Sequence, residues 1–180
     1  MCTGAAEQRA LSGRILHVDS GDYFQGAPVF NQFGGEVEIR VLAELGIDAA
    51  VAGNHEFDEG ARNFATQLEK WSNYRTLAAN YDFASADDPW NSRLDALIDA
   101  YAIFDVQGLK VGVIGMGNLS SITSIETAVQ YLPCEKRARS GWEREASVSG
   151  QVAKTAFSAV NSCRQCEVPP GKKVLSTVRE

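Results

Sequence analysis

Short apolar stretches alternate with amphipathic ones over the first 81 residues of the chain. The apolar stretches are typical of short buried strands and cover residues 14–18, 47–52 and 76–81. Between them, apolar residues recur with helical spacing, first from Glu36 to the stop signal at Gly46. Val37, Val41, Leu42 and Leu45 form the expected buried face of that helix, and Ala61, Phe64, Ala65 and Leu68 form that of the second. Strands alternating with helices over short connections predict a layered α/β fold.

The rest of the chain divides into loops, one hairpin and an unpatterned end. Residues 23–35, rich in glycine, and 82–93, rich in Asp and Ser, are expected to be loops. Residues 101–117 form two apolar runs around Gln107-Gly108, which predicts a β-hairpin. Beyond Ile125 no period persists and the charge becomes basic. We therefore expect an N-terminal extension at 1–13, a domain at 14–125 and a divergent, loosely ordered tail at 126–180.

Composition and charge fit one globular domain and disfavour several classes of partner. The chain has 180 residues, of which 44% are hydrophobic, and its net charge is −6. An acidic chain without a basic cluster in its first 130 residues is not expected to bind nucleic acid. No apolar run is long enough for a membrane segment, and the first residues lack the apolar core of a signal peptide. Location and oligomeric state stay open.

The four cysteines do not form a disulfide or zinc framework. They are Cys2, Cys134, Cys163 and Cys166, and the last two make a single CxxC. A lone CxxC with no histidine after position 55 is weak evidence for zinc, so incidental thiols are the simpler interpretation. A thiol or zinc module at Cys163 and Cys166 stays a third hypothesis for the function of the chain.

Polar loops follow the first two predicted strands. Asp22 ends Ser-Gly-Asp after the first strand, and Asn54 follows Gly53 after the second. One strand–helix–strand unit separates them, so both loops should meet at the carboxyl ends of neighbouring strands, where α/β folds bind ligands. The Asp22 carboxylate could bridge two cations and Asn54 offers an amide oxygen. His55 could act as an acid or stabilise an oxyanion, with its ring oriented by Asp58.

These stretches resemble a known family. "SGDYFQGAP" followed by "GNHEFDEG", together with "LAANY" and "LKVGVIGMGNLSSI", is similar to the calcineurin-like metallophosphoesterases, in the branch of 5′-nucleotidases and UDP-sugar hydrolases. The resemblance implies part of a four-layer αββα sandwich with a dinuclear centre of divalent ions (Mn, Zn, Mg, Ca or Fe). It implies hydrolysis of nucleotide phosphomonoesters, or of related nucleotide sugars and cyclic nucleotides. Carried over, Asp22 is the bridging ligand, Asn54 a ligand of one metal, and His55 with Asp58 the catalytic pair.

The chain departs from this family in its ligand count. The family supplies further ligands from an Asp-x-His on its first strand, a lone histidine and a Gly-His-x-His, and it has a separate C-terminal nucleotide-binding domain. This chain has two histidines in all, His17 and His55, and no Asp-x-His upstream of Arg14. The alternative hypothesis is therefore a truncated or degenerate non-catalytic remnant, from an incomplete or frame-shifted reading of a longer gene.

Several residues near the motifs have simpler expected roles. Asp19 is expected to anchor the first turn, and Tyr23 and Phe24 to pack their loop. Glu56 and Glu59 are expected to be solvated or to support the neighbouring pair rather than to react. The remaining three are His17 as a strand residue, Asn80 at a strand end and Asn118 in a loop at the rim of the site.

Overall fold

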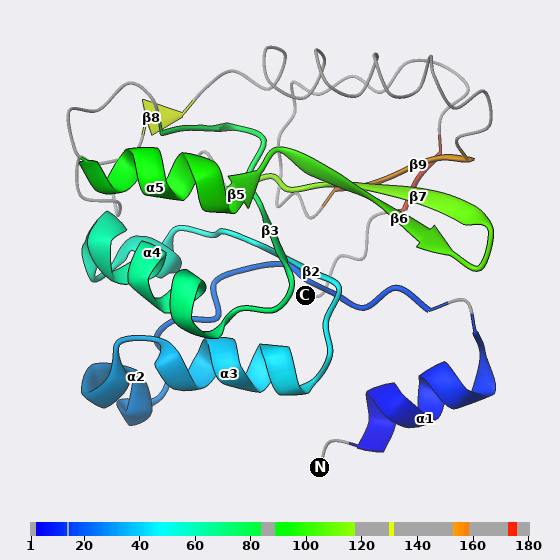
Figure 1. The fold of residues 1–180 in the computed structure, drawn as a ribbon, viewed down its shortest axis with the longest axis horizontal. Helices are drawn as coiled ribbons and strands as arrows, with labels where there is room; N and C mark the ends of the chain where they lie inside the picture. The colour runs from blue at the N-terminus through cyan, green and yellow to red at the C-terminus, as the bar shows by residue number, and fades with distance from the viewer. Residues whose placement is uncertain are drawn as a thin grey trace.

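The computed structural model describes residues 3–13, 15–83, 89–117, 130–131, 153–158 and 173–175 (Figure 1). In its first half the elements are α1 (Thr3–Leu11), β1 (Val18–Asp19), α2 (Pro28–Phe33), α3 (Glu36–Glu44), β2 (Ala49–Val51), the 3-10 turn η1 (His55–Phe57), α4 (Gly60–Trp71) and β3 (Arg75–Leu77). The others are β4 (Tyr81–Asp82), α5 (Pro89–Leu97), β5 (Ile98–Asp99), β6 (Tyr101–Val106), β7 (Leu109–Ile114), β8 (Gln130–Tyr131), β9 (Ala153–Ser158) and β10 (Lys173–Leu175). None of the described helices is long and apolar enough to cross a membrane.

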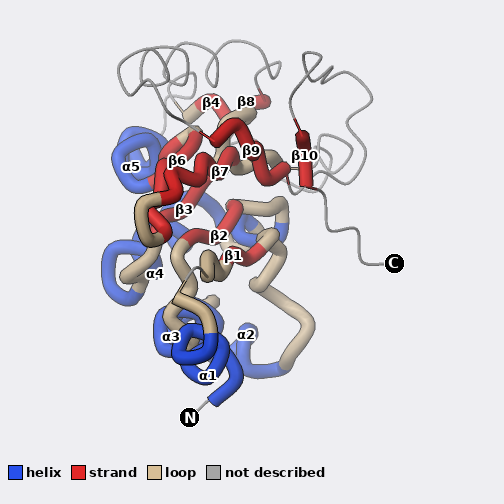
Figure 2. The backbone as a smooth tube through the Cα atoms, turned by 90° about the vertical axis from the view of Figure 1, so that its right-hand side faces the viewer, coloured by secondary structure: helices blue, strands red, loops and turns tan. Residues whose placement is uncertain are grey.

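Two four-stranded sheets form the centre of the fold. The first has the strand order β1-β2-β3-β5 with every neighbouring pair parallel, and the second has the order β10-β9-β7-β6. The helices α2 to α5 lie on one side of the first sheet, and the second sheet lies on its other side (Figure 2). The described residues therefore make three layers of the predicted αββα sandwich, and the α/β fold class is confirmed.

Each interface between the layers has its own apolar core. Between helices and sheet, edge-to-face aromatic contacts join Phe24, Phe57, Phe64 and Tyr81, with ring centroids 5.3–5.7 Å apart. Between the sheets the packing uses smaller side chains, namely Ala49, Leu77, Ala102 and Val113. Phe24 and Phe57 belong to the segments that follow β1 and β2, so this aromatic cluster anchors both segments to the core.

Three predictions about local structure are confirmed. The helix predicted over residues 61–68 is α4, and its four predicted face residues are all buried. The helix from Glu36 is α3, and the hairpin of β6 and β7 pairs Tyr101 with Ile114 through Val106 with Leu109. Both hairpin turn residues have positive φ, 51° at Gln107 and 80° at Gly108, which suits the right-handed twist of the strands.

Other predictions about local structure are wrong. Residues 23–35 are not all loop, because α2 begins at Pro28, where proline has no N–H to satisfy, and ends at Gly34 with φ 58°. Likewise α5 begins at Pro89, inside the predicted loop 82–93. The buried face of α3 is turned from the predicted one: Leu42 is buried as predicted, but Ile39 is buried in addition and Val41 is 49% exposed.

The first and third strands differ from their predicted bounds. The first predicted strand, 14–18, is shifted to Val18–Asp19. One residue before it, the His17 N–H donates to the side chain of Asp48 and the His17 carbonyl accepts from the Asp48 N–H, so regular strand pairing begins after His17. The third is split into β3 and β4. Within the predicted tail, β9 pairs with β7 and with β10, and the four cysteines lie outside the described residues.

Candidate functional site

The loops after β1 and β2 lie side by side, as the sequence predicts. β1 and β2 are parallel neighbours, with Val18 opposite Ala49, so their carboxyl ends open on the same edge of the sheet. One loop carries Asp22 and the other carries Asn54 and His55. The His55 N–H donates to Oδ1 of Asp22 over 3.1 Å, which joins two residues 33 positions apart in the chain.

Glycines allow this close approach. A Cβ built on Gly53 would lie 2.2 Å from Oδ1 of Asp22, and one on Gly21 would lie 2.6 Å from the Val51 carbonyl oxygen. Gly21 also has φ 89°, in the region that favours glycine. Neither position has space for a side chain, so the two glycines set how near the loops can come.

His55 and Asp58 form a pair within and just after η1. Nδ1 of His55 lies 2.8 Å from Oδ2 of Asp58, and their side chains are 42% and 14% exposed. The hydrogen bond to Asp58 raises the pKa of His55 above its ordinary value, against the opposing effect of partial burial. Because the Asp58 carboxylate accepts from Nδ1–H, Nε2 is the ring atom left to face a ligand, and it donates when the imidazole is protonated.

Glu56 lies at the centre of both loops; of its two expected roles, the solvated one is wrong and the supporting one agrees with the structure. Its side chain is fully buried, and its carboxylate accepts hydrogen bonds from the backbone N–H groups of Asp22, Tyr23, Phe24 and Gly53. Burial raises the pKa of the Glu56 carboxyl to about 7, while these donors favour the charged form. The sequence did not indicate these partners, because they are main-chain groups and three of them lie more than 30 residues away along the chain.

Asp22 and Asn54 offer hard oxygen ligands, but by themselves they do not fit a dinuclear metal centre. Catalytic sites commonly use three or more protein ligands for one metal. Asp22 is exposed and its Oδ1 already accepts from His55, whereas Asn54 is only 6% exposed. Among the described residues no three His, Cys, Asp or Glu side chains gather into a metal-binding group. The donor set is one carboxylate and one amide, which is too small for two ions.

The neighbouring residues support the backbone. The Gly21 N–H donates to Oδ1 of Asp19 over 2.9 Å, so Asp19 anchors the turn as predicted. Asn80 forms two 2.9 Å hydrogen bonds with the backbone of Gly117, which tie the end of β3 to the strand end after β7. Glu59 is exposed, and Asn118 lies outside the described residues.

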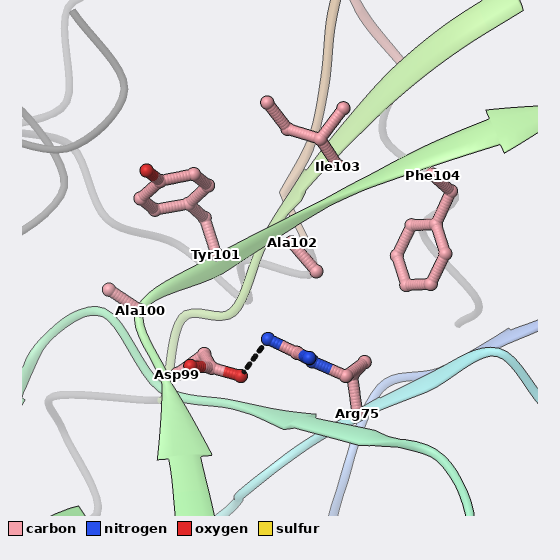
Figure 3. Close-up of a pocket in the computed structure, with 7 residues that line it drawn as sticks. All are labelled: Arg75, Asp99, Ala100, Tyr101, Ala102, Ile103 and Phe104. Carbon is pink, nitrogen blue, oxygen red and sulfur yellow. Dashed lines mark ion pairs between the residues drawn. The ribbon is translucent and has the colours of Figure 1, made fainter. Parts of the chain in front are cut away.

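A separate cavity of about 490 Å³ lies at the edge where β5 leads into β6. Arg75 and Asp99 form an ion pair in it, and residues 100–104 supply the rest of its lining (Figure 3). It includes none of the four predicted site residues. Arg75 begins β3, at the strand end opposite the one that leads toward Asn80, so this cavity is not at the ligand-binding edge of the parallel sheet.

Comparison with known proteins supports the predicted relationship. The chain is 35% identical over 113 residues to a snake venom 5′-nucleotidase of Gloydius brevicauda, and 35% identical over 112 residues to the 5′-nucleotidase of Vibrio cholerae. These matches cover 63% and 62% of this chain, which spans about a fifth (19%) of the length of either relative. No family model matches the sequence.

Solved structures give the same fold. The 5′-nucleotidase precursor of Thermus thermophilus superposes with a TM-score of 0.70 at 27% identity, over 86% of this chain and 29% of that one. The calcineurin-like phosphoesterase YfkN of Bacillus subtilis gives a TM-score of 0.62 at 21% identity, over 92% of this chain and 54% of that one. The predicted resemblance to this group of proteins is confirmed.

Proposed function

Since this chain is related to the 5′-nucleotidases and has the calcineurin-like phosphoesterase fold, we propose that its two joined loops are part of a site that hydrolyses nucleotide phosphoesters. The observation that carries this proposal is the His55–Asp58 pair, held at the sheet edge by the bond from the His55 N–H to Asp22. A nucleotide or another small phosphate ester is the proposed ligand.

The chemistry available to these residues is proton donation and charge stabilisation. Asp58 keeps Nδ1 protonated and fixes the ring, so Nε2 of a protonated His55 can donate to a phosphoryl or leaving-group oxygen. Because Asp58 raises the pKa of His55, the charged imidazolium persists to higher pH than in a free histidine. Asp58 acts through His55, which is the residue that meets the phosphate ester.

The described residues supply only part of what a centre of divalent metal ions needs. In a dinuclear centre, Asp22 and Asn54 are the residues of this chain that would be ligands, as the family resemblance implies. They need further ligands that the described residues do not supply. The second candidate function, raised by the sequence, is a non-catalytic relative without turnover.

Titration of the chain with 5′-AMP, followed by NMR of the His55 ring, tests whether a phosphate ester binds there. The proposal predicts saturable shifts of the His55 ring that are weakened in Asp58→Asn, while Glu59→Gln, an exposed change in the same motif, leaves them in place. Absence of any shift at His55 in the folded chain would contradict the proposed phosphoester site.

Turnover separates the two candidates. The chain is prepared in Mn²⁺, its bound metal is counted, and release of phosphate from 5′-AMP and a chromogenic phosphate ester is measured. Activity that disappears in Asp22→Ala and His55→Ala supports the hydrolase. Binding of 5′-AMP with no turnover and no bound metal supports the non-catalytic relative.

A further inference from the structure

We propose that Glu56 is the positioning residue of the candidate site, because its buried carboxylate joins the loop of Asp22 to the loop of Asn54 and His55. This proposal does not depend on turnover, since the link consists of protein atoms and exists whether or not the site hydrolyses anything. It assigns to a protein carboxylate the task of holding the two loops together before any ligand binds.

The geometry is that of an anion bound by a concave backbone. Oε1 accepts from the N–H groups of Tyr23 and Phe24 over 2.7 and 3.1 Å, and Oε2 accepts from those of Asp22 and Gly53 over 3.0 and 2.6 Å. Three of these donors are consecutive residues. Successive backbone N–H groups that converge in this way form an anion-binding nest.

The backbone of Asp22 fits this interpretation. Its φ is 56°, a value that is uncommon for a residue other than glycine and costs conformational energy. In that conformation the Asp22 N–H contacts Oε2 of Glu56, while the Asp22 carboxylate accepts from the His55 N–H. The unusual turn thus aims the backbone inward at Glu56 and the side chain at the opposite loop.

A glutamate is required by this arrangement. An ionised carboxylate has two oxygens and about four acceptor positions, which match the four donors. Glutamine would put an amide NH₂ against two backbone N–H groups, so two donors would lose their acceptor in a buried place. Alanine at position 56 would leave all four donors without an acceptor.

The Glu56 carboxylate already occupies the nest. A substrate phosphate therefore has to bind elsewhere, on the exposed side near His55.

Amide hydrogen exchange in the unchanged chain, with excess EDTA present, is the first test. The amides of Asp22, Tyr23, Phe24 and Gly53 are expected to exchange at least about tenfold more slowly than the amide of Gly26, a glycine further along the same loop, because each donates to a buried charged acceptor. Equal exchange of all five amides would overturn the proposal. This measurement needs no variant, so it holds even if a substitution at position 56 prevents folding.

Glu56→Gln is the second test, with Glu59→Gln as the matched control in an exposed part of the same motif. We expect Glu56→Gln to raise the exchange rates of the four nest amides by about tenfold or more and to move the His55 amide resonance, because Asp22 is released. Amides in β6 and β7 should keep their rates. Unchanged nest amides, or one uniform increase over both loops and sheets, would overturn the proposal.

Failure of this proposal is distinguishable from failure of the proposed function. Protected nest amides together with no response of His55 to 5′-AMP leave Glu56 as the positioning residue and contradict the phosphoester site. A response of His55 to 5′-AMP that is the same in Glu56→Gln and in the unchanged chain contradicts positioning by Glu56 and leaves the phosphoester site in place.

Discussion

Gly53→Ala tests how closely the two loops of the candidate site are fitted together. The added Cβ would lie 2.2 Å from Oδ1 of Asp22 and 2.8 Å from its backbone nitrogen, whereas ordinary contacts begin at 3.4 Å. The contact with Oδ1 can be relieved by rotation of the Asp22 side chain, but the nitrogen belongs to the main chain, so relief there requires the loops to separate by about 0.6 Å (3.4 − 2.8). The Asp22 side chain cannot solve the clash by rotating alone, so the loops must move apart.

The cost follows from what that movement breaks. Overpacking of this kind costs about 1–3 kcal/mol. Separation of the loops lengthens the bonds from His55 N–H to Asp22 and from Asp22 N–H to Glu56, and one lost bond to a charged group adds about 1.5–3 kcal/mol. Alanine also lowers the conformational entropy of the unfolded chain, which offsets about 0.4–1 kcal/mol of this cost. We expect a loss of about 2 kcal/mol or more in the free energy of unfolding.

Urea denaturation and amide spectra measure this effect, and Gly26→Ala is the control. Gly26 lies in the loop of Asp22 with φ 84° and has no atom within 4 Å of its built Cβ, so alanine there costs backbone strain without a clash. Gly53→Ala should displace the amide resonances of Asp22 and His55, and Gly26→Ala should leave them in place. If Gly53→Ala costs no more than Gly26→Ala and leaves both resonances unmoved, the fitted contact is refuted.

Three further variants probe the pair, the core and a strand end. Asp58→Asn should lower the pKa of His55 toward 6.5. Because the folded chain binds that proton more tightly than the unfolded chain, the stabilisation by the pair is present below pH 6.5 and fades as pH rises through the folded-state pKa. Urea denaturation in EDTA should therefore show a larger difference between variant and parent at about pH 5.5 than at about pH 8.5. Phe64→Ala, at a fully buried ring, should cost about 3–5 kcal/mol by thermal or urea denaturation, against under about 1 kcal/mol for the half-exposed Phe33→Ala. Asn80→Ala should cost about 2 kcal/mol in the same assay, because both its bonds to Gly117 are lost, and an unchanged midpoint would contradict their importance.

The spacing of apolar residues predicted those elements whose own side chains form a buried face. α4 is the clearest case, because Ala61, Phe64, Ala65 and Leu68 all reach the core on one face. The hairpin of β6 and β7 is set by its own turn, which the Gln107-Gly108 dipeptide supplies. The helices α2 and α5 were missed although each begins at a proline, at Pro28 and Pro89, which is a starting signal for a helix.

The candidate site was only partly predictable from the sequence. The pairing of His55 with Asp58 and the meeting of two loops follow from local spacing and from the parallel order of β1 and β2. The burial of Glu56 does not, because a glutamate in a polar motif is ordinarily solvated and its four donors are backbone groups without a sequence signature. Only the folded loops show that they converge on one carboxylate.

The Gly-Asn-His-Glu-Phe-Asp motif therefore serves two physical purposes in this chain. Gly53, Glu56 and Phe57 face inward: the first lets the loops touch, the second joins them, and the third enters the aromatic core against Phe64 and Tyr81. His55 and Asp58 make the pair whose imidazole is open to a ligand. The inward residues are explained by packing and by the joining of the loops, which a chain without turnover would need equally. Activity is therefore tested at the outward pair, by substitutions of His55 and Asp58.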